Sequence, residues 1–241
     1  MSLRNGLGDR MKKNYELVND IRLVHRTPVI VRIDGVGFSK YTKNLHKPFD
    51  STLCEAMQHT AMDLLMLIPT CKFAYTQSDE ISLLLIDYDN IKTDAWYGNS
   101  VRKLTSVIAS LATREFNQSF QLIRARESQF WPGGAIFDAR VFNIPEAEVA
   151  NYFIWRQRDA IRNSIQACGH TLYTQKELEH KNTDEIKKMC AAKHLYWDDI
   201  PISNQRGVAA YKDGTNGYIS DKNIPLFTEN REYIEKYIPK Q

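Results

Sequence analysis

VIVRIDGVGF, residues 29–38, is a run of branched apolar residues that ends in a carboxylate and two glycines. Such a run is typical of a buried strand, so we predict a strand over residues 29–33. The glycines that follow Asp34 predict a tight loop directly after this strand.

A second stretch, FAYTQSDEISLLLI at residues 73–86, predicts a hairpin. Its two strands are expected at residues 72–76 and 81–86, with the acidic turn QSDE between them. Both stretches therefore carry an acidic residue where an apolar strand ends, Asp34 in the first and Asp79 in the second.

Helical patterns separate these strands. The apolar spacing predicts a helix that ends near residue 67, a second helix over residues 100–116 and a strand over residues 140–144. The resulting order is β, α, β, β, α, β, which is the ferredoxin-like arrangement, an α+β fold with its helices on one face of the sheet. Because this order places the first strand beside the hairpin, we expect Asp34 and Asp79 to meet.

The chain is expected to contain two parts. Residues 1–145 form the sheet domain, preceded by a polar N-terminal helix. Residues 146–241 form a helical C-terminal extension packed on that domain, in which Pro145 opens a long helix that closes near Gly169. A shorter helix is expected to end near Lys193.

Composition excludes several classes of protein. The 241 residues carry a net charge of +3, a mild basic excess that permits a nucleic-acid partner without requiring one. Four cysteines without CxxC spacing predict reduced thiols in a cytoplasmic protein. We expect no signal peptide and no membrane partner, because the chain has no run of about 18 apolar residues.

The strand-end acids are candidate ligands for two magnesium ions. Two carboxylates placed close together repel each other, and a divalent cation between them relieves that repulsion. Asp34 and Asp79 would supply side-chain oxygens, and Gly35 would supply its backbone carbonyl. Glu80 either reaches this site as a catalytic group or supports it from behind. The alternative interpretation is that Asp34 is a turn residue and Asp79-Glu80 a solvated hairpin tip.

The glycine-containing loop is a candidate phosphate contact. Glycine lets backbone N–H groups approach phosphate oxygens without an intervening Cβ atom. This loop comprises Gly35, Val36, Gly37, Phe38 and Ser39. It matches neither a dinucleotide-binding fingerprint nor a Walker loop, so an ordinary tight turn is the alternative.

Basic residues form two groups. The first could gather around a triphosphate and comprises Lys40, Lys43, Lys47, Arg102 and Lys103. The second lies on the long C-terminal helix, where it could contact RNA phosphates, and comprises Arg156, Arg158 and Arg162. The alternatives are solvated surface lysines for the first group and a salt-bridged helix face for the second. We expect the aromatic residues of the same helix, Tyr152, Phe153 and Trp155, to lie in the core rather than to form a stacking platform.

Six short motifs occur in the same order as in the tRNA-His guanylyltransferase family, which this chain resembles over roughly residues 25–170. RIDGVGF at residue 32 is similar to the family's RIDGRGF, KPFD at residue 47 to KPND, and YTQSDE at residue 75 to YGQSDE. KLTS at residue 103, FDARV at residue 137 and YFIWRQ at residue 152 are similar to KLVS, FDGRV and YLxWRQ. The bacterial and archaeal branch of the family is the more similar one.

The resemblance implies roles for particular residues. Asp34, the Gly35 carbonyl and Asp79 would hold two magnesium ions. Residues 34–39 would line the nucleotide site together with Ser78 and Asp79. Further contacts of the phosphates are implied for Lys47, Asp50 and Lys103, with Arg102 in place of a family arginine. Asn163, which matches an asparagine of the family's motif, is an implied RNA contact together with the basic residues of the same helix.

The resemblance also implies an activity: a 3′–5′ nucleotide polymerase, similar to the palm of ordinary polymerases, that adds GTP, ATP or other NTPs to the 5′ end of tRNA. A homotetramer is implied as well. Ile161 stands where eukaryotic relatives carry a histidine, which favours template-directed repair of 5′-truncated tRNA over untemplated guanylate addition to tRNA-His. Two other hypotheses are a palm-type nucleotide cyclase and a non-catalytic RNA-binding module.

Overall fold

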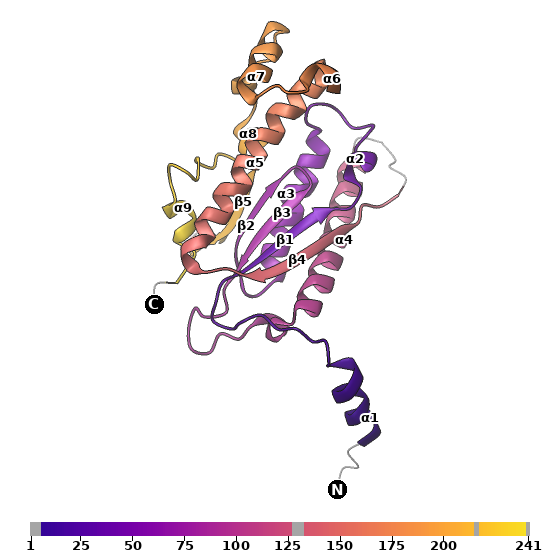
Figure 1. The fold of residues 1–241 in the computed structure, drawn as a ribbon, viewed down its shortest axis with the longest axis vertical. Coiled ribbons are helices and arrows are strands. Elements are labelled where there is room, and N and C mark those ends of the chain that lie inside the picture. The colour runs from indigo at the N-terminus through magenta and orange to yellow at the C-terminus, as the bar shows by residue number, and fades with distance from the viewer. Residues whose placement is uncertain (1–5, 127–132, 215–216, 240–241) are drawn as a thin grey trace.

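A central antiparallel sheet organises the chain in the computed structural model, which describes residues 6–126, 133–214 and 217–239. Within these residues six strands form one sheet in the order β4-β1-β3-β2-β5-β6 (Figure 1). The strands are β1 (Val29–Gly35), β2 (Cys71–Gln77), β3 (Glu80–Leu85), β4 (Phe137–Asn143), β5 (Val208–Asp213) and β6 (Gly217–Asp221). The strand order β4-β1-β3-β2 is that of the predicted ferredoxin-like arrangement, and it places β1 beside the hairpin as expected.

Helices cover both faces of the sheet. The helices α3 (Ser51–Leu67) and α4 (Val101–Arg126) lie on one face, where they share a hydrophobic core with residues such as Val31 and Leu83. The long helix α5 (Glu146–Leu172) lies on the opposite face, over Ile30, Phe73 and Leu84 (Figure 1). Side chains alternate across a strand, so neighbouring residues of β1 enter different cores.

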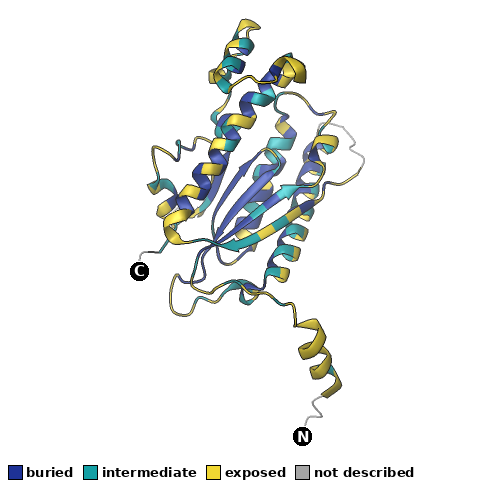
Figure 2. Cartoon of the chain, viewed as in Figure 1, coloured by how far each residue is buried: buried dark blue, intermediate teal, exposed yellow. Residues whose placement is uncertain are grey.

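Shorter elements complete the chain. They are α1 (Gly6–Met11), the π-helix η1 (Lys12–Glu16), α2 (Phe38–Tyr41), the 3-10 helix η2 (Trp96–Asn99), α6 (Gln175–Leu178), α7 (Thr183–Ala192), the 3-10 helix η3 (Trp197–Asp199), α8 (Ile202–Arg206) and α9 (Glu232–Glu235). The segment of α1 and η1 has no buried residues and extends away from the body of the protein (Figure 2). In the parts of the chain that the structure describes, no helix is both long enough and apolar enough to cross a bilayer.

The C-terminal part contains more than the predicted helical extension. It contributes α5 and α7 as expected, but it also adds β5 and β6 to the edge of the sheet beside β2. In this pairing Thr76 lies opposite Val208 and Phe73 lies opposite Tyr211. The physical reason is that β2 would otherwise present an open edge, and a strand from distant sequence covers it. That residues 1–145 and 146–241 pack together as one structural unit stays a prediction.

The hairpin turn is shorter than the sequence suggests. Gln77 and Glu80 are the last and first residues of β2 and β3, so only Ser78 and Asp79 form the turn. Ser78 adopts a left-handed conformation with φ of 51°. Glu80 is therefore a strand residue with a buried side chain rather than part of an exposed tip.

Candidate functional site

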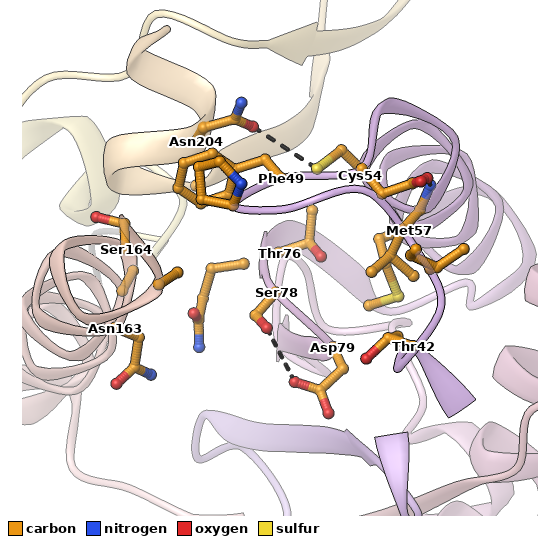
Figure 3. A pocket seen from close by; sticks show the side chains of 18 of the residues that line it. Thr42, Phe49, Cys54, Met57, Thr76, Ser78, Asp79, Asn163, Ser164 and Asn204 are labelled. Atoms are coloured by element: carbon orange, nitrogen blue, oxygen red, sulfur yellow. Dashed lines mark hydrogen bonds between the residues drawn. The ribbon is translucent and has the colours of Figure 1, made fainter. Parts of the chain in front are cut away.

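The ends of β1 and of the β2–β3 hairpin bring the predicted acids together. In the strand register Asp34 lies opposite Glu80, and the backbone N–H of Gly35 donates to the backbone carbonyl of Asp79 at 3.1 Å. The Ser78 hydroxyl donates to the Asp79 carboxylate at 3.1 Å (Figure 3). Residues 45 positions apart in the sequence thus become neighbours through one hydrogen-bonded turn.

The electrostatics of this corner favour a cation. Burial raises the pKa of Asp79 above its ordinary value; the Ser78 hydroxyl and the Asp79 backbone N–H oppose this, while the carboxylate of Asp34 adds to it. Carboxylate and backbone carbonyl oxygens are the hard donors that magnesium prefers. The donor set of Asp34, Asp79 and the Gly35 carbonyl therefore fits that ion. Within the described residues, no group of three or more His, Cys, Asp or Glu is placed to hold a metal by side chains alone.

A further acid, Asp138, lies on the other side of Asp34. It is the β4 residue directly opposite Asp34 in the register, and its side chain is 57% exposed. Glu80, Asp34 and Asp138 thus form a row across three neighbouring strands. Sequence reasoning noted the FDARV motif that contains Asp138 but assigned this residue no role, because the register of β4 against β1 is not readable from the motif.

Glu80 is bound by arginine side chains on the buried side of the site. Its two carboxylate oxygens accept hydrogen bonds from Nε and Nη2 of Arg156, each at 2.6 Å, and Arg32 lies 3.4 Å away. Burial raises the pKa of Glu80, and the bonds from Arg156 oppose that shift. This placement supports a positioning role for Glu80 behind the acids rather than direct catalysis.

The basic residues of α5 fall into two environments. Arg156 is buried, and its Nη1 also donates to Asp159 at 2.8 Å, so it presents no surface for the predicted RNA contact. Arg158 and Arg162 are exposed, although Arg162 also donates to Asp159 at 2.9 Å. Asn163 is exposed as well and borders the pocket described next.

A pocket of about 400 Å³ opens beside Asp79, between α3, α5 and α8 (Figure 3). Seven of the predicted site residues line it: Phe38, Ser39, Lys47, Asp50, Ser78, Asp79 and Asn163. Sequence reasoning did not identify the lining residues Phe49, Cys54, Met57 and Asn204, which come from a loop and two helices distant in sequence. The Cys54 thiol donates to the Asn204 side-chain oxygen at 3.6 Å and so joins α3 to α8.

Asp50 and Gly35, both predicted nucleotide contacts, also stabilise the local structure. Asp50 is buried; its carboxylate caps α3 through the Leu53 N–H at 3.0 Å and lies 3.3 Å from Arg124. Gly35 must be a glycine, because a Cβ atom there would lie 2.1 Å from the ring of Phe38. Val36 and Gly37 complete the loop, and Gly37 adopts a left-handed φ of 66°.

Arg102 and Lys103 lie at the start of α4, away from the acidic corner, and their triphosphate contact stays a prediction. They are exposed residues at the start of α4, next to Ser100, whose hydroxyl donates to Asp20. The strand ends that carry Asp34 and Asp138 instead lie level with the middle of α4, where the Thr113 hydroxyl accepts from the Phe137 N–H. With a rise of 1.5 Å per residue, ten residues of helix separate these positions by about 15 Å.

All three aromatic residues of α5 were expected to lie in the core, but only two of them do. Tyr152 and Phe153 are buried, whereas Trp155 is 49% exposed. The helix turns by about 100° per residue, so position 155 lies on the flank of α5, beside the side that packs on the sheet. The expectation is confirmed for two residues and wrong for Trp155.

Comparisons with known proteins agree with this fold and its motifs. The family profile "Thg1: tRNAHis guanylyltransferase" matches residues 8–145. A bacterial tRNA(His) guanylyltransferase (Thg1)-like protein solved in complex with ATP superposes with a TM-score of 0.88 at 39% identity, over 96% of this chain and 99% of that chain. A second such structure, in complex with GTP, has a TM-score of 0.80 at 37% identity, over 96% and 98%.

Among curated proteins, the tRNA(His) guanylyltransferase of Debaryomyces hansenii is 30% identical over 165 residues, which is 64% of this chain and 59% of that protein. The present chain therefore spans little more than half of that eukaryotic relative. The profile match, the superposition with the bacterial structures and the shared motifs lead to one conclusion: the chain belongs to the tRNA(His) guanylyltransferase (Thg1) family.

Proposed function

We propose that this protein is a 3′–5′ nucleotidyltransferase that adds nucleoside triphosphates to the 5′ end of tRNA. The observation that carries the proposal is that the end of β1 with Asp34 meets the turn with Asp79, and that Asp79 lines a pocket of about 400 Å³. A volume of this order suits a small ligand such as a nucleotide. Two related structures were solved in complex with ATP and with GTP.

The incoming nucleotide would occupy the pocket. Met57 and Phe49 provide apolar surface for a base, while Ser39, Ser78 and the exposed Lys47 provide polar groups at the rim. A lysine ammonium is a suitable partner for a triphosphate because it carries three rotatable donors on a flexible stem. Phe38 anchors the glycine-containing loop in the core, since its buried ring packs against Phe116 and Phe137.

Magnesium fits the acidic corner, where Asp34, Asp79 and the Gly35 carbonyl would hold two ions. When bound, such ions lower the pKa of an attacking hydroxyl and neutralise phosphate charge. The chain's own contribution is to place the acids beside the pocket and to hold Asp79 by the Ser78 hydroxyl and the Gly35 N–H. In the reaction the NTP 3′ hydroxyl attacks the 5′ α-phosphorus of the activated tRNA, and pyrophosphate or AMP leaves.

The tRNA would approach along the end of β4 beside Asp34, where Asp138 and Arg140 are exposed. Arg158 and Arg162 on α5 are exposed as well and would contact RNA phosphates. A homotetramer would spread a large substrate over several subunits. The four free cysteines support a cytoplasmic, reducing environment.

Template-directed repair is the form of the reaction that we favour. Ile161 replaces the histidine of the eukaryotic motif, and it packs partly buried against the small core formed with Ile165 and Ile186. An apolar residue there cannot take part in proton transfer or phosphate binding. Untemplated guanylate addition to tRNA-His is the alternative, because Asn163 of the same motif is retained.

The deciding experiment offers each NTP separately to tRNAs that lack one 5′ nucleotide, with each of the four opposing bases. We expect incorporation to follow base pairing. Equal incorporation of GTP whatever the opposing base would support untemplated addition, and a labelled cyclic nucleotide with no label on the RNA would identify a cyclase instead.

A further inference from the structure

Part of one sheet face is uncovered next to the acidic corner. The helix α5 covers Ile30 of β1 and contacts Phe142 of β4 through Tyr152, whereas the end of β4 beside Asp34 is less covered (Figures 1 and 2). On β4 the side chains of Asp138 and Arg140 are 57% and 52% exposed. The open strip therefore borders α5 on one side and contains Asp34 and Asp138 at one end, whereas Glu80 of the same row is buried.

Trp155 stands at the edge of this strip and is held firmly there. The guanidinium of Arg156 lies over its indole ring, 4.4 Å from the centroid, and the ring of Tyr152 meets it edge-on at 5.9 Å. Arg156 is itself fixed by Glu80 and Asp159. The indole is thus ordered by buried neighbours although 49% of the residue is exposed.

Trp155 also lies close to the catalytic acids. The guanidinium of Arg32 is 5.9 Å from the indole centroid, and its Nε is 3.4 Å from Glu80. Asp34 follows Arg32 by two residues on the same face of β1, which corresponds to about 7 Å. The residues that line the nucleotide pocket do not include Trp155. The indole therefore flanks the acids outside the place proposed for the incoming nucleotide.

We propose that Trp155 stacks on the 5′-terminal base of the RNA and so holds the accepting end beside Asp34 and Asp79. This inference rests on the proposed function. Proteins recognise exposed terminal bases by stacking them on aromatic rings, and every base offers a flat face. A preordered indole loses little conformational freedom when it binds a base.

The test compares W155L with W155F, since leucine keeps apolar bulk and phenylalanine keeps a stackable ring. We expect W155L to raise the KM for 5′-truncated tRNA roughly tenfold and W155F to change it less than about threefold. Neither variant should alter the KM for ATP or GTP, and thermal unfolding confirms that both variants fold. A wild-type enzyme without activity on RNA would refute the proposed function; an active wild type with an equally active W155L would refute only the stacking.

A second measurement excludes an indirect structural effect. Replacing the 5′-terminal base of the tRNA by an abasic residue removes the stacking partner. With this RNA we expect W155L and the wild type to have the same KM; a tenfold difference that persists would contradict the proposal. Indole fluorescence that is quenched by tRNA in the wild type but not in W155F, which keeps the other three tryptophans, would support it.

Discussion

Arg156 and Glu80 form a two-point ion pair in which Nε and Nη2 of the arginine each lie 2.6 Å from a carboxylate oxygen. Both side chains are buried, with 5% and 6% exposed. The pair ties the long helix α5 to the first residue of β3, next to the turn that carries Asp79. The helix and the acidic corner are therefore positioned by one another.

Breaking this pair is expected to destabilise the protein. In R156M the carboxylate of Glu80 remains buried near Arg32 without its main partner, which should lower the free energy of unfolding by about 3 kcal/mol. The additional change E80Q removes the buried charge and should restore part of that loss. Urea unfolding of both variants, with R158M as an exposed control, measures the effect. An R156M variant as stable as R158M would contradict this account.

Glycine is required at position 35 for a different reason than at position 37. G35A places a Cβ atom 2.1 Å from the Phe38 ring, which is packed in the core and cannot withdraw freely. We expect a loss of 1–3 kcal/mol of stability, of the order seen for overpacked cores, together with weaker ATP binding. G37A meets no atom within 4 Å and should lose about 1 kcal/mol from its left-handed backbone alone. Denaturant unfolding that ranked the two variants in the reverse order would show that the Phe38 contact is not decisive.

The two lysines of the family motifs should differ in their effect on nucleotide binding. Lys47 lines the pocket, whereas Lys103 lies at the start of α4 near the other end of the sheet. Removing a charged contact to the triphosphate should weaken ATP binding roughly tenfold in K47A. K103A should bind ATP within about twofold of the wild type. Titration calorimetry tests the pair, and equal losses in both variants would place Lys103 at the nucleotide after all.

The alkylation rate of the Cys54 thiol should show whether the pocket binds ATP. Burial, followed by the nearby carboxylate of Asp50, raises the pKa of the Cys54 thiol to about 11. Because the thiolate is the reactive form, its alkylation should be slow at pH 8 and should accelerate about tenfold per pH unit until the pH approaches 11. Bound ATP should protect Cys54, which lines the pocket. Mass spectrometry of iodoacetamide-treated protein gives both results; rapid labelling at pH 7, or no protection by ATP, would count against the assigned pocket.

The local sequence was enough to predict the core of the fold. The apolar run that ends at Asp34 and the hairpin before Ile86 predicted β1, β2 and β3, because burial on both faces demands continuous apolar strands. The strands β5 and β6 were missed. The DG and NG dipeptides at residues 213–217 do mark a turn between two short runs, but nothing in the local sequence shows that the first run pairs with β2, more than a hundred residues distant.

The sequence predicted only those site residues that are acidic and also stand at the end of a strand. Asp34 and Asp79 stand at strand ends, so their sequence positions already indicate a shared corner. The burial of Glu80 depends on Arg156, 76 residues away, and no local pattern reveals that pairing. The exposure of Trp155 likewise depends on how α5 leaves the end of β4 beside Asp34 less covered, since its neighbours Tyr152 and Phe153 are buried as the pattern suggests.

The most direct test is the rate of NTP addition to a 5′-truncated tRNA across a magnesium titration, for the wild type, D34N and D79N, with the exposed D184N as control. We predict that each of the first two variants folds and binds tRNA but loses at least roughly a hundredfold in rate at every magnesium concentration, while D184N matches the wild type. Wild-type rates at saturating magnesium in either D34N or D79N would contradict the assignment of these two carboxylates to the metal-dependent transfer.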